Sequence, residues 1–182
     1  MTDQKQLSSE SLKSEKVVSI IKDAFRKFDL LEDPKCLKEA AARIRQMVDY
    51  SPADLGEFVR VAASEFHLDA VDGGSWGEML TFLIQEGPPG EYVIPPSIHL
   101  INLGCELERS DVTIRVLGDV GEAVGYLMKK GRIVVEGNAE DEAGVSMEGG
   151  ELHIIGDVEG FGVPIRGKIY QWGELVYDNG WK

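Results

Sequence analysis

The chain has 182 residues, of which 43% are hydrophobic and 28% charged, the proportions of an ordinary globular domain or pair of domains. Its formal net charge is −13 and both halves are acidic, which argues against a surface that follows nucleic-acid phosphates and favours solubility or a basic protein partner. No apolar run is long enough to span a bilayer, and residues 1–16 lack the apolar segment of a signal peptide. Two distant cysteines, Cys36 and Cys105, form neither a disulfide framework nor a metal box. We therefore expect a cytoplasmic protein with no nucleic-acid or membrane partner.

Four segments with apolar residues at helical spacing follow a polar stretch, residues 1–12, which we expect to be frayed. The first spans Ser14–Leu31, and the others begin at Asp33-Pro34, at Ser51-Pro52 and at the capping box Ser75–Glu78. The predicted inner faces are Val17, Ile20, Ile21, Ala24, Phe28 and Leu31; Leu37, Ala40, Ala41, Ile44, Met47 and Val48; Leu55, Phe58, Val59, Ala62 and Phe66; and Trp76, Met79, Leu80, Leu83 and Ile84. These segments predict an α-helical bundle domain over residues 1–90.

A stretch rich in proline and glycine, Glu86–Gly90, ends the last helix and is predicted to be a stiff linker. Tyr92–Pro96 is expected to be extended, because residues before proline avoid the helical region. Ser97–Gly104 is typical of a strand ended by glycine, which would form an incomplete first coil of the repeat that follows. Since the apolar period changes here from that of a helix to that of a strand, we predict separate domains, 1–90 and 91–182.

Residues Val112–Gly167 repeat at a constant interval, which is the separation of Gly118 from Gly137 and of Gly137 from Gly156. The other positions that recur at this interval are Gly125 and Gly144; Gly131 and Gly150; and Met128 and Met147. Short alternating or β-branched runs such as Ile133–Glu136 lie between them, without helical periodicity. A repeat this short buries its apolar face only by stacking on its neighbours. We therefore predict a parallel β-helix with glycines at its corners, where a positive φ or close backbone approach is needed.

Stacking in this register places similar residues above one another inside the coil. The predicted inward lanes are Ile114, Ile133 and Leu152; Val116, Val135 and Ile154; Val120, Ala139 and Val158; Val124 and Ala143; and Met128 and Met147. The third coil departs from the period, since Ile169 follows Leu152 more closely than Leu152 follows Ile133. In the same coil, Pro164 and Arg166 replace a small residue and a methionine. We therefore expect the solenoid to end near Gly167.

The pattern of glycines and methionines from Gly118 to Gly150 resembles the GXGXG domain. That domain is the C-terminal β-helix of the glutamate synthase large subunit and the body of the β-helical subunit of formylmethanofuran dehydrogenase. The resemblance covers about residues 98–170 and implies a right-handed β-helix that acts as a scaffold and carries no catalytic residues of its own. It does not extend to residues 1–90, and the amidotransferase and flavin-binding portions of glutamate synthase are missing, so that activity is not carried over.

The expected fold class is thus α+β in separate domains, with an N-terminal α-helical bundle followed by a C-terminal single-stranded right-handed parallel β-helix. The tail after Gly167 is rich in aromatic residues, namely Tyr170, Trp172, Tyr177 and Trp181. We interpret them as a cap over the last coil, because uncovered strand edges aggregate. The second interpretation is an exposed contact for a protein partner.

The residues that could carry chemistry have simpler structural explanations. The candidates are His67, His99 and His153; the acidic column Asp119, Asn138 and Asp157 beside Glu140–Glu142; Ser146; and the glycine-rich stretch Gly118–Gly121. The histidines lack ligand spacing, and the column has an asparagine in its middle and no calcium-binding repeat, which favours a solvated acidic face. The serine is followed by Glu148 where a nucleophile elbow needs glycine, and no helix follows the glycines to bind a phosphate. We predict no catalytic residue, metal or cofactor.

Three hypotheses of function follow. The first is a non-catalytic scaffold or interaction protein in a multi-subunit or self-associated assembly. The alternative is a subunit of a redox enzyme complex related to formylmethanofuran dehydrogenase or archaeal-type glutamate synthase, whose other chains would carry flavin, iron–sulfur or pterin chemistry. A free-standing hydrolase is the third. The helical half separates the first two hypotheses, since neither family's β-helix needs one.

Overall fold

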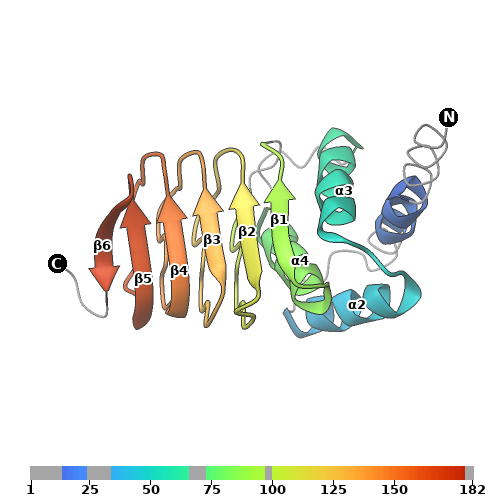
Figure 1. The fold of residues 1–182 in the computed structure, drawn as a ribbon, viewed down its shortest axis with the longest axis horizontal. Coiled ribbons are helices and arrows are strands. Elements are labelled where there is room, and N and C mark those ends of the chain that lie inside the picture. The colour runs from blue at the N-terminus through green and yellow to red at the C-terminus, as the bar shows by residue number, and fades with distance from the viewer. Residues whose placement is uncertain (1–13, 24–33, 66–72, 97–99, 179–182) are drawn as a thin grey trace, which may run out of the picture.

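The computed structural model describes residues 14–23, 34–65, 73–96 and 100–178. Helices lie at one end and a row of strands extends from them (Figure 1). The elements are a helix over residues 14–23, α2 (Pro34–Met47), α3 (Pro52–Glu65), α4 (Gly73–Glu86), β1 (Gly90–Ile94), β2 (Val112–Val116), β3 (Arg132–Val135), β4 (Glu148–Ile154), β5 (Arg166–Gln171) and β6 (Glu174–Asp178). Several residues named above lie outside the described ranges: Ala24, Phe28, Leu31, Phe66, His67, His99 and Trp181.

Local capping sets the start of α3. Ser51 Oγ accepts the Asp54 N–H at 3.2 Å, and Asp54 Oδ2 accepts the Ser51 N–H at 2.9 Å, so each residue satisfies a donor of the first turn. Helix α4 begins at Gly73, two residues before the serine of the expected capping box at Ser75–Glu78. Glu78, the other residue of that box, accepts a hydrogen bond from Asn102 Nδ2 at 2.9 Å and so contacts a residue distant in sequence.

The predicted inner faces of the helices are mostly buried. The buried residues are Val17, Ile21, Leu37, Ala40, Ala41, Ile44, Leu55, Phe58, Val59, Ala62, Trp76, Met79, Leu80, Leu83 and Ile84. Met47, which the pattern places inside, is 59% exposed, because it is the last residue of α2 and the chain leaves the helix there. Helix α2 packs on α4, and α3 packs on β1, so the helices contact the sheet as well as one another.

The strands belong to a β-solenoid of about four turns over residues 90–171. Strands β1 to β5 form a parallel sheet in chain order, so each connection from one strand to the next makes one coil. In the step from β3 to β4, Ile133 pairs with Leu152 and Val135 with Ile154, as the constant interval of the repeat predicts. Strand β6 pairs antiparallel with β5 and is the last strand of the sheet.

Stacked apolar lanes fill the solenoid. The buried members are Ile114, Ile133, Leu152, Val116, Val135, Ile154, Val120, Ala139, Val124, Ala143, Met128 and Met147, which confirms the inward positions expected from the repeat. Ile169 pairs with Leu152 and extends the first lane despite the shorter spacing. Val158, also expected inside, is half-buried and lies in the last coil.

The repeated glycines satisfy two different backbone requirements. Gly131 and Gly150 have φ values of +87° and +79°, a region that costs other residues steric energy. Gly137 does not have a positive φ, but a Cβ added to it would lie 2.5 Å from the carbonyl carbon of Gly118 in the preceding coil. The glycine there allows two coils to approach each other closely.

The solenoid begins earlier than the sequence predicts. Strand β1 is its first rung and pairs Tyr92 with Ile114. The strand expected at Ser97–Gly104 is wrong over its described part, because residues 101–106 form turns, although the segment belongs to the first coil, where the Leu103 carbonyl accepts the Gly125 N–H at 2.8 Å. The interval from Tyr92 to Ile114 is longer than the one from Ile114 to Ile133, so the first coil does not share the period that identifies the others.

The helices cover the N-terminal end of the solenoid through close contacts. A Cβ added to Gly77 of α4 would overlap the carbonyl oxygen of Ile101, so only glycine permits this approach. The buried Thr81 hydroxyl accepts the Gly104 N–H at 2.8 Å and donates to the Gly77 carbonyl at 2.7 Å. One hydrophobic core continues from the helices into the coils. The division of the chain into two domains at residue 90 stays a prediction.

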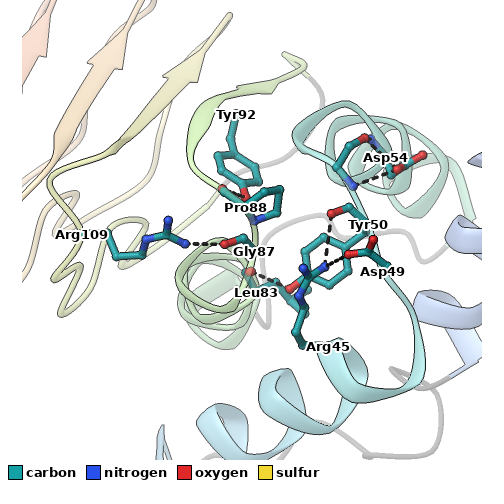
Figure 2. Close-up of polar contacts among 10 residues, drawn as sticks. Arg45, Asp49, Tyr50, Asp54, Leu83, Gly87, Pro88, Tyr92 and Arg109 are labelled. Carbon is teal, nitrogen blue, oxygen red and sulfur yellow. Dashed lines mark hydrogen bonds and ion pairs between the residues drawn. The ribbon is translucent and has the colours of Figure 1, made fainter.

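Figure 2 shows side chains that satisfy carbonyl groups at and just beyond the C-terminal end of α4, where a helix leaves such acceptors unpaired. The bonds run from Tyr50 Oη to Leu83 O at 2.7 Å, from Tyr92 Oη to Pro88 O at 2.6 Å, and from Arg109 Nη1 to Gln85 O at 3.2 Å and to Gly87 O. Burial raises the pKa of Tyr92 to about 12 and also raises the pKa of Tyr50. Both phenols therefore stay protonated donors at neutral pH.

Candidate interaction surfaces

Two residues of the aromatic tail pack against the coil that precedes them. Tyr177 of β6 is 4% exposed and donates a hydrogen bond from Oη to the Pro164 carbonyl at 3.0 Å. Tyr170 lies on the outer face of β5 and stacks on His153, with ring centroids 4.2 Å apart and planes 7° from parallel. These two side chains hold the last strands against the coil before them.

Trp172 fits the second interpretation, that of an exposed contact. It follows β5 at the turn into β6, with a positive φ of +52°, and 65% of its surface is exposed. Ile155, which follows β4 at the same edge of the sheet, is 54% exposed. Trp181, the fourth aromatic residue of this prediction, lies outside the described residues.

The column of Asp119, Asn138 and Asp157 is a hydrogen-bonded ladder. Asp119 Oδ1 accepts the Asn138 N–H at 2.7 Å, and Asn138 Oδ1 accepts the Asp157 N–H at 2.8 Å. The side-chain oxygens of the first two rungs are thus used to join neighbouring coils. In the described part of the chain, no group of three or more His, Cys, Asp or Glu residues could hold a metal ion.

A strongly acidic surface surrounds this ladder. We define the acidic wall as Asp119, Glu122, Asp141, Glu142, Asp157 and Glu159, all exposed. The loops that carry them, residues 117–126, 136–146 and 155–163, contain no Lys or Arg, and no described residue forms an ion pair with a member of the wall. A shallow cleft of about 370 Å³ lies along the ladder. The wall concentrates negative potential on one side of the solenoid.

The sheet side differs, because several of its charges form ion pairs. Arg115 contacts Glu91 at 2.9 Å and Glu136 at 2.8 Å. Arg132 contacts Glu151 at 3.6 Å, and the same carboxylate lies 3.2 Å from His153 Nε2. Cations and anions alternate across neighbouring strands and offset one another locally.

Neither His153 nor Ser146 lies in an arrangement typical of catalysis. Burial lowers the pKa of His153, and its ring is occupied by stacking and by contacts with Arg132 and Glu151. Ser146 has a φ of +54° and lies in a turn, where its N–H donates to the Val163 carbonyl at 3.0 Å. Within the described ranges this hydroxyl has no histidine or carboxylate base bonded to it.

The cysteines are separate, and the buried one is unreactive. Both are free thiols. Burial raises the pKa of Cys105 to about 12, with smaller contributions from Glu78 and Glu106. This thiol therefore stays protonated at neutral pH and is a poor nucleophile or metal ligand.

Sequence reasoning missed a groove of about 540 Å³ between α3 and the sheet. Its apolar lining includes Val93, which is 38% exposed, and Leu117, which is 41% exposed. A Cβ added to Gly56 of α3 would lie 2.7 Å from the Val93 carbonyl oxygen, so the helix closely approaches one end of the groove. In the sequence, the groove could have been found only from Val93 and Leu117, two apolar residues at outward positions near the ends of neighbouring strands.

No helix in the described ranges is both long enough and apolar enough to cross a bilayer. Comparisons with protein-family models, with curated proteins and with solved structures found no match to this chain.

Proposed function

We propose that the chain is a cytoplasmic, non-catalytic interaction scaffold and part of a larger assembly. In this proposal the N-terminal helices form a bundle, and the solenoid is a single-stranded right-handed β-helix of the GXGXG type. The support for the β-helix type is the regular glycine and methionine pattern, together with the buried lanes that it predicts. In this scaffold the helices cover one end of the solenoid, and the coils present an extended surface.

The acidic wall is the observation that carries the proposal. Its carboxylates are exposed on three successive coils and lack ion-pair partners among the described residues, whereas several charges of the sheet side form ion pairs. Keeping like charges together costs repulsion, which a basic partner would relieve. A surface of this kind accelerates encounter and selects partners by complementary charge. The partner expected is therefore a protein with a basic surface.

Affinity capture from the native host with the full chain tests this proposal. The variant Asp119→Asn, Glu122→Gln and Asp141→Asn removes three charges of the wall and keeps the side-chain oxygens of the ladder. The matched control Glu15→Gln, Glu39→Gln and Glu86→Gln removes three exposed charges from the helices. We expect a basic partner to be captured by the wild type and the control, released at high salt, and lost with the wall variant. Equal capture by all three chains, or no specific capture, would refute the proposal.

The alternative function, a subunit of a redox complex, rests on the same repeat pattern and differs in the partner it requires. A captured chain that carries flavin, iron–sulfur clusters or a pterin would favour it. The visible absorption spectrum of the captured complex distinguishes the two functions, because a scaffold bound to a protein without a chromophore absorbs only in the ultraviolet.

A further inference from the structure

The residues that directly follow strands β1 to β4 form a column along one edge of the sheet, where the strands end side by side (Figure 1). We define this outer column as Pro95, Leu117, Glu136 and Ile155. Backbone hydrogen bonds keep its members in register, since the Leu117 N–H donates to the Ile94 carbonyl at 2.9 Å and the Ile155 N–H to the Val135 carbonyl at 2.8 Å. Successive members therefore lie one coil apart.

The outer column is mostly apolar, although it lies on the surface. Leu117 and Ile155 are both exposed, and the charge of Glu136 is offset by Arg115 at 2.8 Å. At the α3 end the column continues into the groove described above, because Leu117 is part of the lining together with Val93, which is also exposed. Apolar residues that form a continuous exposed set bordered by polar ones are typical of an interaction site.

The hydrogen-bonded ladder of Asp119, Asn138 and Asp157 lies beside this column. Each of its members follows a member of the column by two residues, so at most about 7 Å separates the two Cα atoms. Asp119 and Asp157 form no ion pair with any described residue. A segment lying along the column would thus meet apolar side chains on one side and carboxylates on the other, which selects an apolar segment with a basic flank.

The spacing of these residues distinguishes a helical segment from an extended one. Leu117 and Ile155 are two coils apart, as are Asp119 and Asp157, and two strand spacings make about 9.6 Å. Residues i and i+7 of an α-helix lie on one face about 10.5 Å apart. Residues on one face of an extended strand are about 6.6 Å apart and then about 13 Å apart. The helix fits both pairs, and the extended strand fits neither.

We propose that the outer column and the ladder together dock an amphipathic α-helix of another protein, lying along the solenoid axis. Two apolar residues seven positions apart would contact Leu117 and Ile155, and an apolar residue one turn earlier would enter the groove beside Val93. Lysine or arginine residues on one flank of the helix would pair with Asp119 and Asp157. The inference rests on the proposed function and names the form of the basic partner.

A second copy of this chain is a poorer occupant. The apolar faces of the described helices are already buried within the chain, as Leu37 of α2, Phe58 of α3 and Leu83 of α4 illustrate. None of these helices could present such a face to another copy without leaving its own core. Two copies, each with a formal net charge of −13, would also repel each other.

Fluorescence anisotropy of the full chain with three labelled peptides of about 15 residues tests the inference. All contain leucine, lysine and alanine. The first has leucines on one helical face and lysines along one flank, the second has a proline at its centre, and the third has the composition of the first with leucine and lysine in strand-like alternation. The first should bind, and the others should bind at least about tenfold more weakly. Equal binding of the alternating peptide, or no binding of the first, would overturn the inference.

Two pairs of variants locate the binding of the first peptide. Ile155→Ser should weaken it about tenfold, whereas Val163→Ser, which changes a 72% exposed aliphatic residue outside the column, should alter it by less than about twofold. Asp119→Asn combined with Asp157→Asn keeps the oxygens of the ladder and should weaken binding about fivefold. The control, Glu15→Gln with Glu39→Gln on the helices, should change it by less than about twofold. Equal effects within either pair would overturn the inference.

Repeating the capture experiment with Ile155→Ser separates this inference from the proposed function. A basic partner that is lost with the wall variant and also with Ile155→Ser supports both. A partner that is lost with the wall variant but still captured by Ile155→Ser overturns the inference and leaves the proposed function standing. Sedimentation tests the other occupant, since a wild-type dimer that Ile155→Ser dissociates would assign the column to a second copy and overturn the inference.

Discussion

Each end of the solenoid has a terminal coil with no further coil to cover it, and the two ends are covered in different ways. At the N-terminal end, α4 approaches the first coil so closely that Gly77 cannot carry a side chain, and Thr81 links the two through its hydroxyl. At the C-terminal end, the antiparallel strand β6 pairs with β5 along the sheet edge, while Val163 and Ile165 of the last coil are exposed. Stacked coils always present unpaired rungs at both ends. Among the described residues, closely packed helices cover the first end, whereas the second end has a strand paired with its sheet edge.

Removing the helices, or removing β6, should lower the stability of the chain more than any single substitution. A fragment of residues 90–182 lacks the helices and exposes β1 and the first coil, so we expect it to aggregate or unfold. A chain truncated after Gln171 loses residues 172–182, which include β6, and should keep a cooperative thermal transition at a lower temperature. Circular dichroism and light scattering measure both. A soluble 90–182 fragment with a cooperative transition would support the division into two domains and contradict the dependence on the helical cover.

Between the ends, the buried lanes should tolerate little change. Met147 is fully buried and stacks in the lane of Met128, so Met147→Ala should lower the free energy of unfolding by roughly 2–5 kcal/mol. Glu148, the next residue, is exposed, and Glu148→Ala should cost no more than about 0.5 kcal/mol. Urea unfolding of both full-length variants measures the difference. Equal destabilisation would show that the inward and outward positions are assigned incorrectly.

Alkaline pH should weaken the covered end selectively. Tyr50 and Tyr92 have pKa values raised by burial in the folded state. Their contribution is therefore fully present below the unfolded tyrosine pKa, about 10, and is lost as pH rises toward and beyond 12, the folded pKa of Tyr92. Urea unfolding at increasing pH should show this loss, and Tyr92→Phe should reduce its slope. An unchanged slope in the Phe variant would exclude Tyr92 as a source.

The smallest expected effect comes from Glu78 at the same junction. Burial raises its pKa, although the Asn102 amide opposes the shift, so the ionised form is disfavoured in the folded state. Stability from this group is present below its unfolded pKa and is lost as pH rises through the folded pKa. Glu78→Gln keeps an oxygen for Asn102 and should stabilise the chain at neutral pH by less than about 1 kcal/mol, with no gain at strongly acidic pH. Destabilisation at neutral pH would show that the carboxylate is needed.

The coils could be predicted because the constant spacing of the repeat determines which residues lie above one another. Glycine and methionine recur at one constant interval, and the lanes from Ile114 to Met147 follow from that spacing alone. Only part of the first coil could be recognised, because the interval from β1 to β2 is longer than the period, and Gly104, which lies against Gly125, therefore falls outside the constant spacing of the other glycines. Likewise, the bonds of Tyr50 and Arg109 join segments far apart in sequence, and no local pattern reveals them.

The C-terminal end of the solenoid could be predicted only in part. The change at Pro164 and Arg166 indicates where the period stops, but the exposure of Val163 and Ile165 depends on which sides β6 covers. The aromatic tail illustrates the same limit. Tyr177 and Trp172 look alike in the sequence, yet one is buried against Pro164 and the other lies exposed at a turn. Their different roles follow from the hairpin register.

Equal coils make the distance between the two ends adjustable. Deleting residues 118–136 would join Leu117 to Gly137 and place each remaining residue beneath a neighbour of the same chemical type. Each unit deleted or duplicated would change the separation of the ends by one strand spacing, about 4.8 Å. Both ends would keep their own contacts, so duplication or deletion of a short gene segment could change the length of the solenoid in discrete steps.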